Sequence, residues 1–195
     1  YGDEVVINQL NLEIPKGRTV ALVGSSGGGK STIIDLFSRL YEPTAGAITL
    51  DGIDLRDLSL EGLRKLISVV DQNTFLFNDT VANNIAYGHT DSSAERIEAA
   101  ARAANAHDFI MRLPAGYDTV LAERGQTLSQ GQRQLLAFAR VLAADPEILV
   151  LDEATASIDT ETEQLVAAAI ETLTRNRTSI IIAHRLSTIK KADCI

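Results

Sequence analysis

Short apolar runs, each about the length of one strand, recur along the first part of this chain. They are separated by polar turn residues, among them Pro15-Lys16-Gly17 and Asp51-Gly52. The runs predict strands at Val5–Ile7, Leu10–Ile14, Val20–Val23 and Ala47–Leu50, and a fifth follows at Ile67–Val70. The beginning of the chain is therefore predicted to be rich in β-structure.

Apolar positions at helical spacing dominate the middle of the chain and then alternate with strands. Ser92 and Ser93 are placed to cap an alanine-rich helical region, which extends from about residue 91 to residue 112. Further on, the pattern predicts helices at 130–142 and 161–173 and strands at 148–151 and 179–183. Helices that alternate with strands indicate a mostly parallel sheet covered by helices, which makes this an α/β protein.

Composition narrows the class of protein. With 195 residues, 45% of them hydrophobic, the chain can bury one core with a smaller subdomain beside it. Its longest apolar runs are strand-sized, far below the roughly 18 residues of a membrane helix, and no charged-then-apolar leader opens it, so we expect no membrane span. The net charge of −8, without a basic block, disfavours a broad nucleic-acid surface. The single cysteine, Cys194, excludes an internal disulfide and fits a reducing cytosol.

A glycine-rich loop lies between the apolar run that ends at Val23 and the helix predicted to begin near Ile33. Backbone N–H groups of such a loop surround a polyphosphate, the helix adds its positive N-terminal end, and Lys30 adds a cation. Ser31 lies where its hydroxyl can hold Mg²⁺. A flexible turn would not demand Gly-Lys-Ser at a helix start. The predicted nucleotide-binding residues are Gly24, Ser25, Ser26, Gly27, Gly28, Gly29, Lys30, Ser31 and Thr32.

Two carboxylates, Asp152 and Glu153, directly follow the apolar run Ile148–Leu151. A central parallel strand of this kind opens onto the ligand crevice at its carboxyl end. Asp152 is predicted to bind Mg²⁺, and Glu153 to accept a proton from, or orient, the water that attacks the γ-phosphate. The alternative is that both residues only cap the next helix.

The run Leu128-Ser129-Gln130-Gly131-Gln132 joins a helix-capping serine to a glycine and a long amphipathic helix. From helix rules alone it is either an ordinary N-cap or an anion-binding helix start. Together with the phosphate loop and Asp152-Glu153, it resembles the signature of ATP-binding cassette (ABC) ATPases, which are P-loop NTPases. The family's usual form is Leu-Ser-Gly-Gly-Gln, so Gln130 departs from it. The resemblance implies that the ATP of a second domain meets Ser129, Gln130, Gly131 and Gln132.

Four other positions follow the order of this family's motifs. Tyr1 resembles the aromatic residue that stacks on adenine, and Gln72 the glutamine that senses Mg²⁺ and water. Asp159 resembles the aspartate of the D-loop, and His184 the switch histidine that contacts the γ-phosphate. Their local alternatives are solvated strand ends for Gln72 and His184 and a helix cap for Asp159. By this resemblance the catalytic residues are Lys30, Gln72, Glu153 and His184, and the metal ligands are Ser31, Gln72 and Asp152.

Two further segments resemble those of ABC exporters whose membrane and ATPase domains share one polypeptide. They are Phe75–Gly88, after the glutamine, and Glu123-Arg124-Gly125, before the signature. In that group, helices of the membrane domain dock on these segments. On physical grounds alone, Phe75-Leu76-Phe77 is more often core than interface.

The resemblance implies an ABC ATPase domain with an N-terminal antiparallel β region and an α-helical subdomain. We expect residues 1–72 and 147–195 to form the core and about 73–146 the helical subdomain, with the domain continuing beyond residue 195. Implied cofactors are ATP and Mg²⁺, and implied partners are a second ATPase domain and the membrane domain of the same polypeptide. The implied location is the cytoplasmic face of a membrane. The alternatives are a soluble ABC ATPase acting on nucleic acid or the ribosome, and a non-hydrolysing regulatory cassette.

Overall fold

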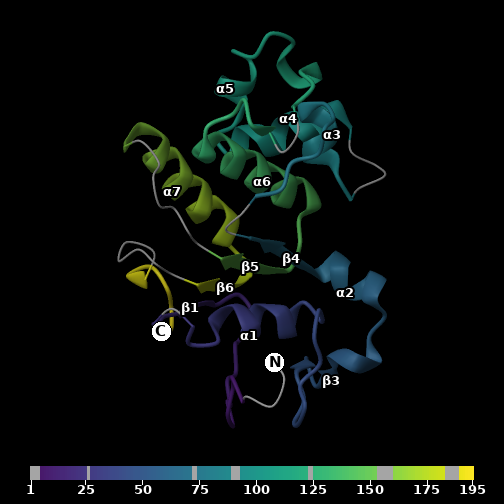
Figure 1. Cartoon of the computed structure of the whole chain (residues 1–195), viewed down its shortest axis with the longest axis vertical. Coiled ribbons are helices and arrows are strands. Elements are labelled where there is room, and N and C mark those ends of the chain that lie inside the picture. Colours follow the sequence, from purple (N-terminus) through teal and green to yellow (C-terminus); the bar gives the residue numbers. More distant parts are fainter. Residues whose placement is uncertain are drawn as a thin grey trace. The chain divides into compact units, whose positions relative to one another are not determined.

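The computed structural model describes residues 5–25, 27–71, 74–88, 93–122, 125–152, 160–182 and 189–195. The chain divides into two compact units, each with its own packing (Figure 1). The first unit comprises Tyr1–Val69, Glu147–Glu153 and Asn176–Ile195. The second comprises Val70–Pro146 and Ala154–Arg175. Within the described ranges, no helix has both the length and the apolar composition needed to cross a membrane.

A four-stranded sheet forms the centre of the first unit. Its order is β1-β6-β5-β4, and β6 is parallel to both β1 and β5. The strands are β1 (Thr19–Leu22), β4 (Ile67–Val70), β5 (Ile148–Asp152) and β6 (Thr178–Ile182). The core contains Val150 and Ile180, against which Ile34 of the first helix packs. The continuous apolar runs in the sequence therefore predicted these central strands correctly, because a strand covered on both faces needs apolar side chains at every position.

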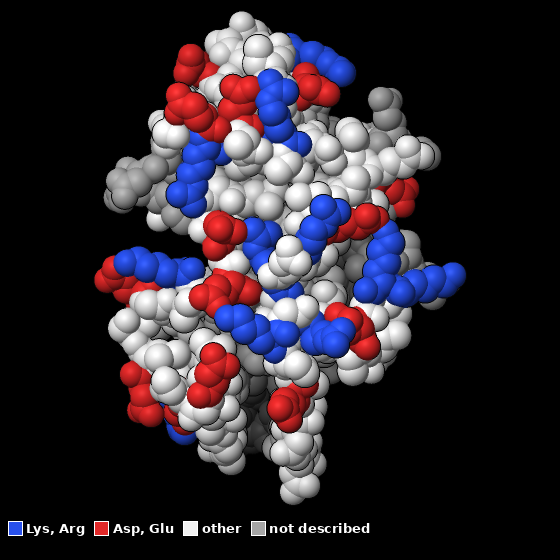
Figure 2. Space-filling model, turned by 180° about the vertical axis from the view of Figure 1, so that it is seen from behind, with Lys and Arg blue, Asp and Glu red and all other residues white. Residues whose placement is uncertain are grey.

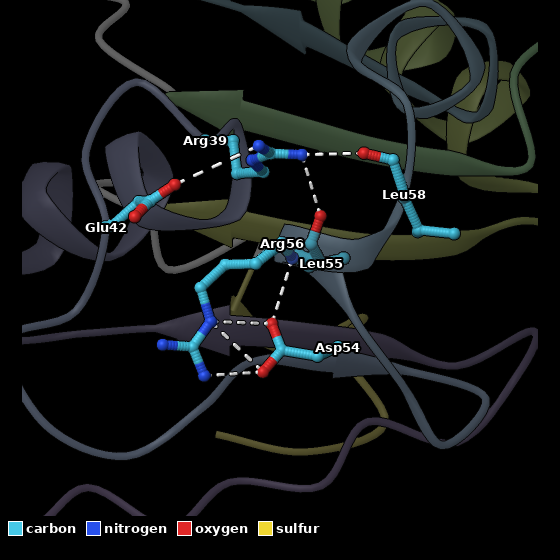
Figure 3. A network of polar contacts seen from close by, with 6 residues as sticks. All are labelled: Arg39, Glu42, Asp54, Leu55, Arg56 and Leu58. Atoms are coloured by element: carbon cyan, nitrogen blue, oxygen red, sulfur yellow. Dashed lines mark hydrogen bonds and ion pairs between the residues drawn. The ribbon is translucent and has the colours of Figure 1, made fainter.

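The remaining elements of the first unit are short. They are α1 (Lys30–Phe37), the antiparallel pair β2 (Thr49–Leu50) and β3 (Ile53–Asp54), a 3₁₀ turn η1 (Leu55–Asp57) and α2 (Leu60–Leu66). The Arg39 guanidinium follows α1 and donates to the carbonyl oxygens of Leu55 and Leu58, at 2.8 and 2.7 Å (Figure 3). Hydrogen bonds from Arg56 lower the pKa of Asp54 to about 2. These contacts fix the β2–β3 hairpin and η1 beside the end of α1.

The strands predicted at Val5–Ile7 and Leu10–Ile14 are not formed in the described part of the chain, so this prediction was wrong. Val5 and Leu10 remain 73% and 53% exposed, and among the residues of these runs only Ile14 packs against the core of the sheet. Alternating apolar residues become a strand only when a partner strand and a buried face are available. The antiparallel region is instead the β2–β3 hairpin, which includes the end of the predicted 47–50 strand.

Helices make up the second unit. They are α3 (Val81–Ala86), α4 (Ala94–Ala103), α5 (His107–Ile110), the 3₁₀ turn η2 (Gly116–Asp118), α6 (Gln130–Ala144) and α7 (Thr160–Thr174). The longest apolar face belongs to α6, which packs against α3, α4 and α7 (Figure 1). Ser93 caps α4 as predicted, by accepting a hydrogen bond from the Arg96 N–H.

The division of the chain differs from the predicted one at one helix. The sequence-based boundary assigned all of 147–195 to the core, whereas residues 154–175, which include α7, group with the helical unit. Packing of α7 on α6 accounts for the difference. Chain order alone does not reveal such a contact, because α7 lies between two strands of the sheet in the sequence.

Candidate functional site

The glycine-rich loop ends where α1 begins, and this helix start has an unusual cap. Gly29 is the N-cap with φ of +80°, a left-handed conformation that glycine adopts without strain, and no side chain caps the helix. By contrast, Ser or Thr side chains cap α2, α3, α4 and α6. The backbone N–H groups of the first turn of α1 are therefore open to an external acceptor, and a phosphate is the acceptor that such an end favours.

The loop is tightly packed at two of its glycines. A Cβ on Gly28 would lie 3.1 Å from the Ser25 carbonyl oxygen, and one on Gly29 would lie 3.2 Å from Cγ1 of Val6. The Gly28 N–H also donates to the Ser25 carbonyl oxygen at 3.2 Å. Backbone alone can thus form the tight curve that phosphate binding requires.

Lys30, the first residue of α1, folds back over the loop. Its ammonium nitrogen Nζ donates to the carbonyl oxygens of Gly24 and Ser25, at 2.9 and 2.7 Å. A lysine ammonium has three N–H donors, so one remains for a phosphate oxygen while two fix the loop. Ser31 is exposed in the same turn, and Thr32 is half-buried. The structure therefore brings the predicted residues from Gly24 to Thr32 together, apart from Ser26, which lies outside the described residues.

Strand register places Asp152 at the level of the phosphate loop. Leu22 at the end of β1 and Asp152 at the end of β5 both align with Ile182 of β6. Neighbouring strands are about 4.8 Å apart, so β1 and β5 end roughly 10 Å from each other at one edge of the sheet. The hydroxyl of Ser31 and the carboxylate of Asp152 are hard oxygen ligands, which fit Mg²⁺. A nucleotide whose phosphates occupy the loop is therefore within reach of both groups.

In the second unit, Ser129 is the N-cap of α6, as predicted. Its side-chain oxygen accepts from the Gln132 N–H at 3.2 Å, and its own N–H donates to Oε1 of Gln132 at 3.0 Å. This capping box is the local geometry expected of an ordinary N-cap. Gln130 is exposed at the helix start, and Gly131 is buried.

Phe75, Phe77 and Tyr87 form an aromatic surface. The two phenylalanines lie between β4 and α3, and Tyr87 directly follows α3. Phe75 and Tyr87 are 52% and 55% exposed, Phe77 is half-buried, and Leu76 between the two phenylalanines is fully buried. The Phe77 ring stacks on Tyr87 with centroids 4.1 Å apart and meets Phe75 edge-on at 5.0 Å. Leu76 is thus part of the core, whereas Phe75 and Tyr87 are exposed and Phe77 is half-buried.

Comparison with known proteins identifies the family. The family model described as "ABC transporter" matches residues 7–156. The chain belongs to the ABC transporter family.

Similar proteins agree with this assignment. An "ATP-dependent lipid A-core flippase" of Syntrophus aciditrophicus is 55% identical over 195 residues, which is 100% of this chain and 32% of the relative. The flippase of the same description from Escherichia coli strain K12 is 55% identical over 192 residues, covering 98% of this chain and 33% of that protein. The chain therefore spans about a third of the length of these curated relatives.

A solved structure supports the fold. A bacterial Atm1-family ABC exporter with ATP bound superimposes with a TM-score of 0.91 and 46% sequence identity. The match covers 99% of this chain and 34% of that one. The predicted α/β fold of a P-loop ABC ATPase is confirmed.

Several residues of the ABC motifs fall outside the described part of the chain. The predicted roles at these positions therefore stay predictions. They concern Tyr1, Ser26, Gln72, Glu123, Arg124, Glu153, Asp159 and His184.

Two residues that the sequence did not single out organise the aromatic surface. Asn84 of α3 is 1% exposed, and its side-chain amide bonds to both backbone groups of Phe77, accepting from the N–H at 2.8 Å and donating to the carbonyl oxygen at 3.0 Å. Arg140 of α6 donates from Nε to the Asn84 carbonyl oxygen at 2.8 Å and from Nη1 to the Phe75 carbonyl oxygen at 3.1 Å. No local pattern reveals a pair of residues that are 56 positions apart in the chain.

Gly125, just before the signature, also packs on this segment and provides a test. A Cβ there would lie 2.8 Å from Cδ1 of Leu76, and φ is +63°. We expect Gly125→Ala to lower the free energy of unfolding by about 1–3 kcal/mol more than Gly88→Ala does, because overpacking adds to the shared backbone strain. Gly88 has φ of +90° and no atom near the added Cβ, so it is the matched control. Equal losses in chemical denaturation would contradict the close packing of Gly125 on Leu76.

Proposed function

We propose that this chain is the ATP-hydrolysing domain of an ABC exporter, in which ATP binding joins two such domains and hydrolysis separates them. The observation that carries the proposal is the uncapped start of α1, where Lys30 lies across the glycine loop at the edge of the sheet that also ends in Asp152. A loop of this geometry is suited to the phosphates of a nucleotide.

The proposed chemistry is positional and electrostatic. The open N–H groups of α1 and the Lys30 ammonium hold the β- and γ-phosphates, and Ser31, Gln72 and Asp152 are the proposed Mg²⁺ ligands. When bound, Mg²⁺ supplies positive charge that offsets the charge developing on the phosphate oxygens. Glu153 is the proposed base that orients the attacking water, and His184 holds the transferring group in place.

The proposed partner at the nucleotide is a second domain of the same family. In this proposal Ser129 and Gly131 contact the ATP held by the partner's phosphate loop. Tyr1 is the proposed aromatic residue that stacks on the adenine, and Asp159 is the proposed aspartate of the D-loop. The capping box leaves Ser129 Oγ a further lone pair and its hydroxyl proton, since in the box the oxygen only accepts from Gln132. Closure of two domains then moves membrane helices that belong to the same polypeptide, at the cytoplasmic face of a membrane.

Charge distribution supports export over action on nucleic acid. On the face shown in Figure 2, acidic Asp and Glu side chains lie among the Lys and Arg side chains. The sequence carries a net charge of −8. The presence of both Lys30 and Asp152, with Glu153 next in the sequence, favours a hydrolysing domain over a regulatory cassette.

The proposed cargo is an amphipathic lipid. The flippases that share 55% of the aligned residues are described as acting on lipid A-core, which makes that lipid the first substrate to test. The proposed docking site for the membrane domain is the aromatic surface of Phe75, Phe77 and Tyr87.

The docking role predicts that Phe75→Glu, made in the full-length protein, uncouples transport from hydrolysis. Phe75 is half exposed, so a charge there stays in contact with water and the melting temperature should change little. An apolar helix end that docks on Phe75 would lose its contact, and lipid moved per ATP hydrolysed should fall. The measurement combines ATPase activity, lipid movement in proteoliposomes and thermal melting.

Leu76→Glu is the matched control for this experiment. Its side chain is fully buried, and an unpaired charge there costs several kcal/mol, so this variant should melt far below the unchanged protein. A large fall in the melting temperature of Phe75→Glu as well would place Phe75 in the core and would contradict the docking role.

A further inference from the structure

One side chain, that of Arg140, links the aromatic surface directly to the signature helix α6. Arg140 lies on α6, 11 residues and therefore about 16 Å along the helix from the signature serine, Ser129. Its guanidinium reaches the carbonyl oxygens of Phe75 and Asn84, and it also donates from Nη2 to Oδ1 of Asn84 at 3.3 Å. These three hydrogen bonds join the segment before α3, and α3 itself, to α6.

The same guanidinium lies against two aromatic rings. Its central carbon is 5.7 Å from the centroid of Phe77 and 5.6 Å from that of Tyr87. These two rings stack on each other, so one cation contacts both members of the pair. Any displacement of Tyr87, which is exposed, therefore changes the surroundings of Arg140.

The charge of Arg140 is balanced in an uncommon way. Among the described residues, no carboxylate lies within ion-pair distance of this guanidinium. Burial lowers the pKa of Arg140. Within the described ranges, the hydrogen bonds of this half-buried cation go to two backbone carbonyl oxygens and to Oδ1 of Asn84, and taking a charge partly out of water without an ion-pair partner is costly.

Backbone contacts add a second connection between the same parts of the unit. The Val81 N–H donates to the Thr119 carbonyl oxygen at 3.0 Å, and the Leu121 N–H donates to the Asp79 carbonyl oxygen at 2.9 Å. The chain from Leu121 leads on to Gly125, which packs on Leu76 and precedes the signature. The chain around Phe75–Val81 is thus joined to the signature helix in two ways, through the Arg140 side chain and through backbone hydrogen bonds to the chain that leads into the signature.

We propose that Arg140 is a positioning residue that transmits movement of the docking aromatics Phe77 and Tyr87 to the signature helix α6. The inference rests on the proposed function, since it requires that a membrane domain docks on these aromatics. Its mechanism depends on the planar fork of the guanidinium, which bonds two carbonyl oxygens and covers two rings at the same time. Lysine keeps the charge but cannot make this set of contacts.

The test uses the full-length protein in proteoliposomes, with lipid A-core as the probe, and compares Arg140→Lys with Arg39→Lys. Arg39 is the matched control because its guanidinium also donates to two backbone carbonyl oxygens, at 2.8 and 2.7 Å, in the first unit (Figure 3). We expect Arg140→Lys to lower the lipid moved per ATP hydrolysed by about 2- to 30-fold, while KM for ATP stays unchanged. Arg39→Lys should leave the ratio unchanged, even if it lowers the melting temperature.

A purely structural role for Arg140 would give a different result. Loss of folded protein lowers transport and hydrolysis together, so an unchanged ratio in Arg140→Lys overturns the proposal. Phe77→Leu tests the same connection without altering the arginine, and it should also lower the ratio. This second variant keeps the test decisive if Arg140→Lys fails to fold.

Tyr87→Ser distinguishes failure of the docking role from failure of the positioning role of Arg140. If Tyr87→Ser lowers the ratio and Arg140→Lys does not, docking stands and the positioning role is refuted. If neither variant changes the ratio, the docking role fails and the inference fails with it. If the unchanged protein hydrolyses ATP but moves no lipid A-core, the proposed cargo is wrong.

Discussion

Glu153→Gln should reduce ATP hydrolysis by roughly 10²- to 10⁴-fold while ATP binding persists. Glutamine keeps the shape of the side chain but lacks the charge that polarises the attacking water, and the loss of a positioned general base has this magnitude. Steady-state hydrolysis and nucleotide affinity are to be measured on the same preparation. Full activity in Glu153→Gln would refute the catalytic role.

The matched control lies at the opposite end of the same strand. Glu147 precedes β5 and pairs with Lys16 at 3.2 Å, with both side chains exposed. Glu147→Gln should leave hydrolysis unchanged, since an exposed ion pair contributes little to stability and its carboxylate lies away from the nucleotide-binding edge.

ATP that the Glu153→Gln variant binds but does not hydrolyse should also hold two domains together. If ATP bridges Lys30 of one domain and Ser129 of the other, Glu153→Gln protein should form dimers in Mg-ATP, as measured by analytical ultracentrifugation. Adding Ser129→Arg should abolish these dimers, because the larger side chain occupies the space of the partner's phosphates. A Glu153→Gln protein that remains monomeric when saturated with ATP would count against a shared site.

Lys30→Ala is expected to weaken Mg-ATP binding by about 10- to 150-fold, which corresponds to the loss of one hydrogen bond to a charged group. The substitution removes both the phosphate contact and the bonds from Nζ to Gly24 and Ser25, but it opens no cavity in the core. Isothermal titration measures the affinity, and circular dichroism measures the fold.

Lys16→Ala is the control for charge alone. Lys16 belongs to the same unit, its side chain is 82% exposed, and its removal changes net charge by the same amount. The affinity of the Lys16→Ala variant for Mg-ATP should match that of the unchanged protein. Unchanged affinity in Lys30→Ala, with an unchanged spectrum, would show that the glycine loop is not the nucleotide site.

The sequence predicted correctly the elements that are specified by residues close together in the chain and, for the strands, by burial on both faces. Strands β5 and β6 are buried on both faces, so their runs of apolar residues were sufficient to locate them. The start of α6 was equally clear, because Ser129 and Gln132 form a capping box within four residues. Gly29-Lys30-Ser31 likewise located the start of α1, which begins at Lys30 with Gly29 as its N-cap.

The features that sequence reasoning missed depend on distant partners. Apolar alternation at Val5–Ile14 predicted strands, but a strand also needs an edge to pair with, and that edge is not encoded locally. The grouping of α7 with α6 and the contact of Arg140 with Asn84 likewise join parts of the chain that are far apart. For Phe75-Leu76-Phe77, physical reasoning favoured core over interface, whereas the structure buries Leu76, leaves Phe75 exposed and half-buries Phe77.

Strand β6 lies between β1 and β5, so it sets the spacing between the glycine loop after β1 and Asp152 at the end of β5. Leu22 of β1 and Asp152 of β5 share Ile182 as their register partner, and strand pairing rests on the backbone, so the spacing between the glycine loop and Asp152 depends little on which apolar side chains β6 carries. Substitutions among Val, Ile and Leu on this strand are accordingly neutral for chemistry as long as the pairing holds. A one-residue insertion within β6 would turn the apolar side chains that follow it to the opposite face of the sheet, and it would break the register that β1 and β5 share on this strand, although neither Lys30 nor Asp152 would be altered.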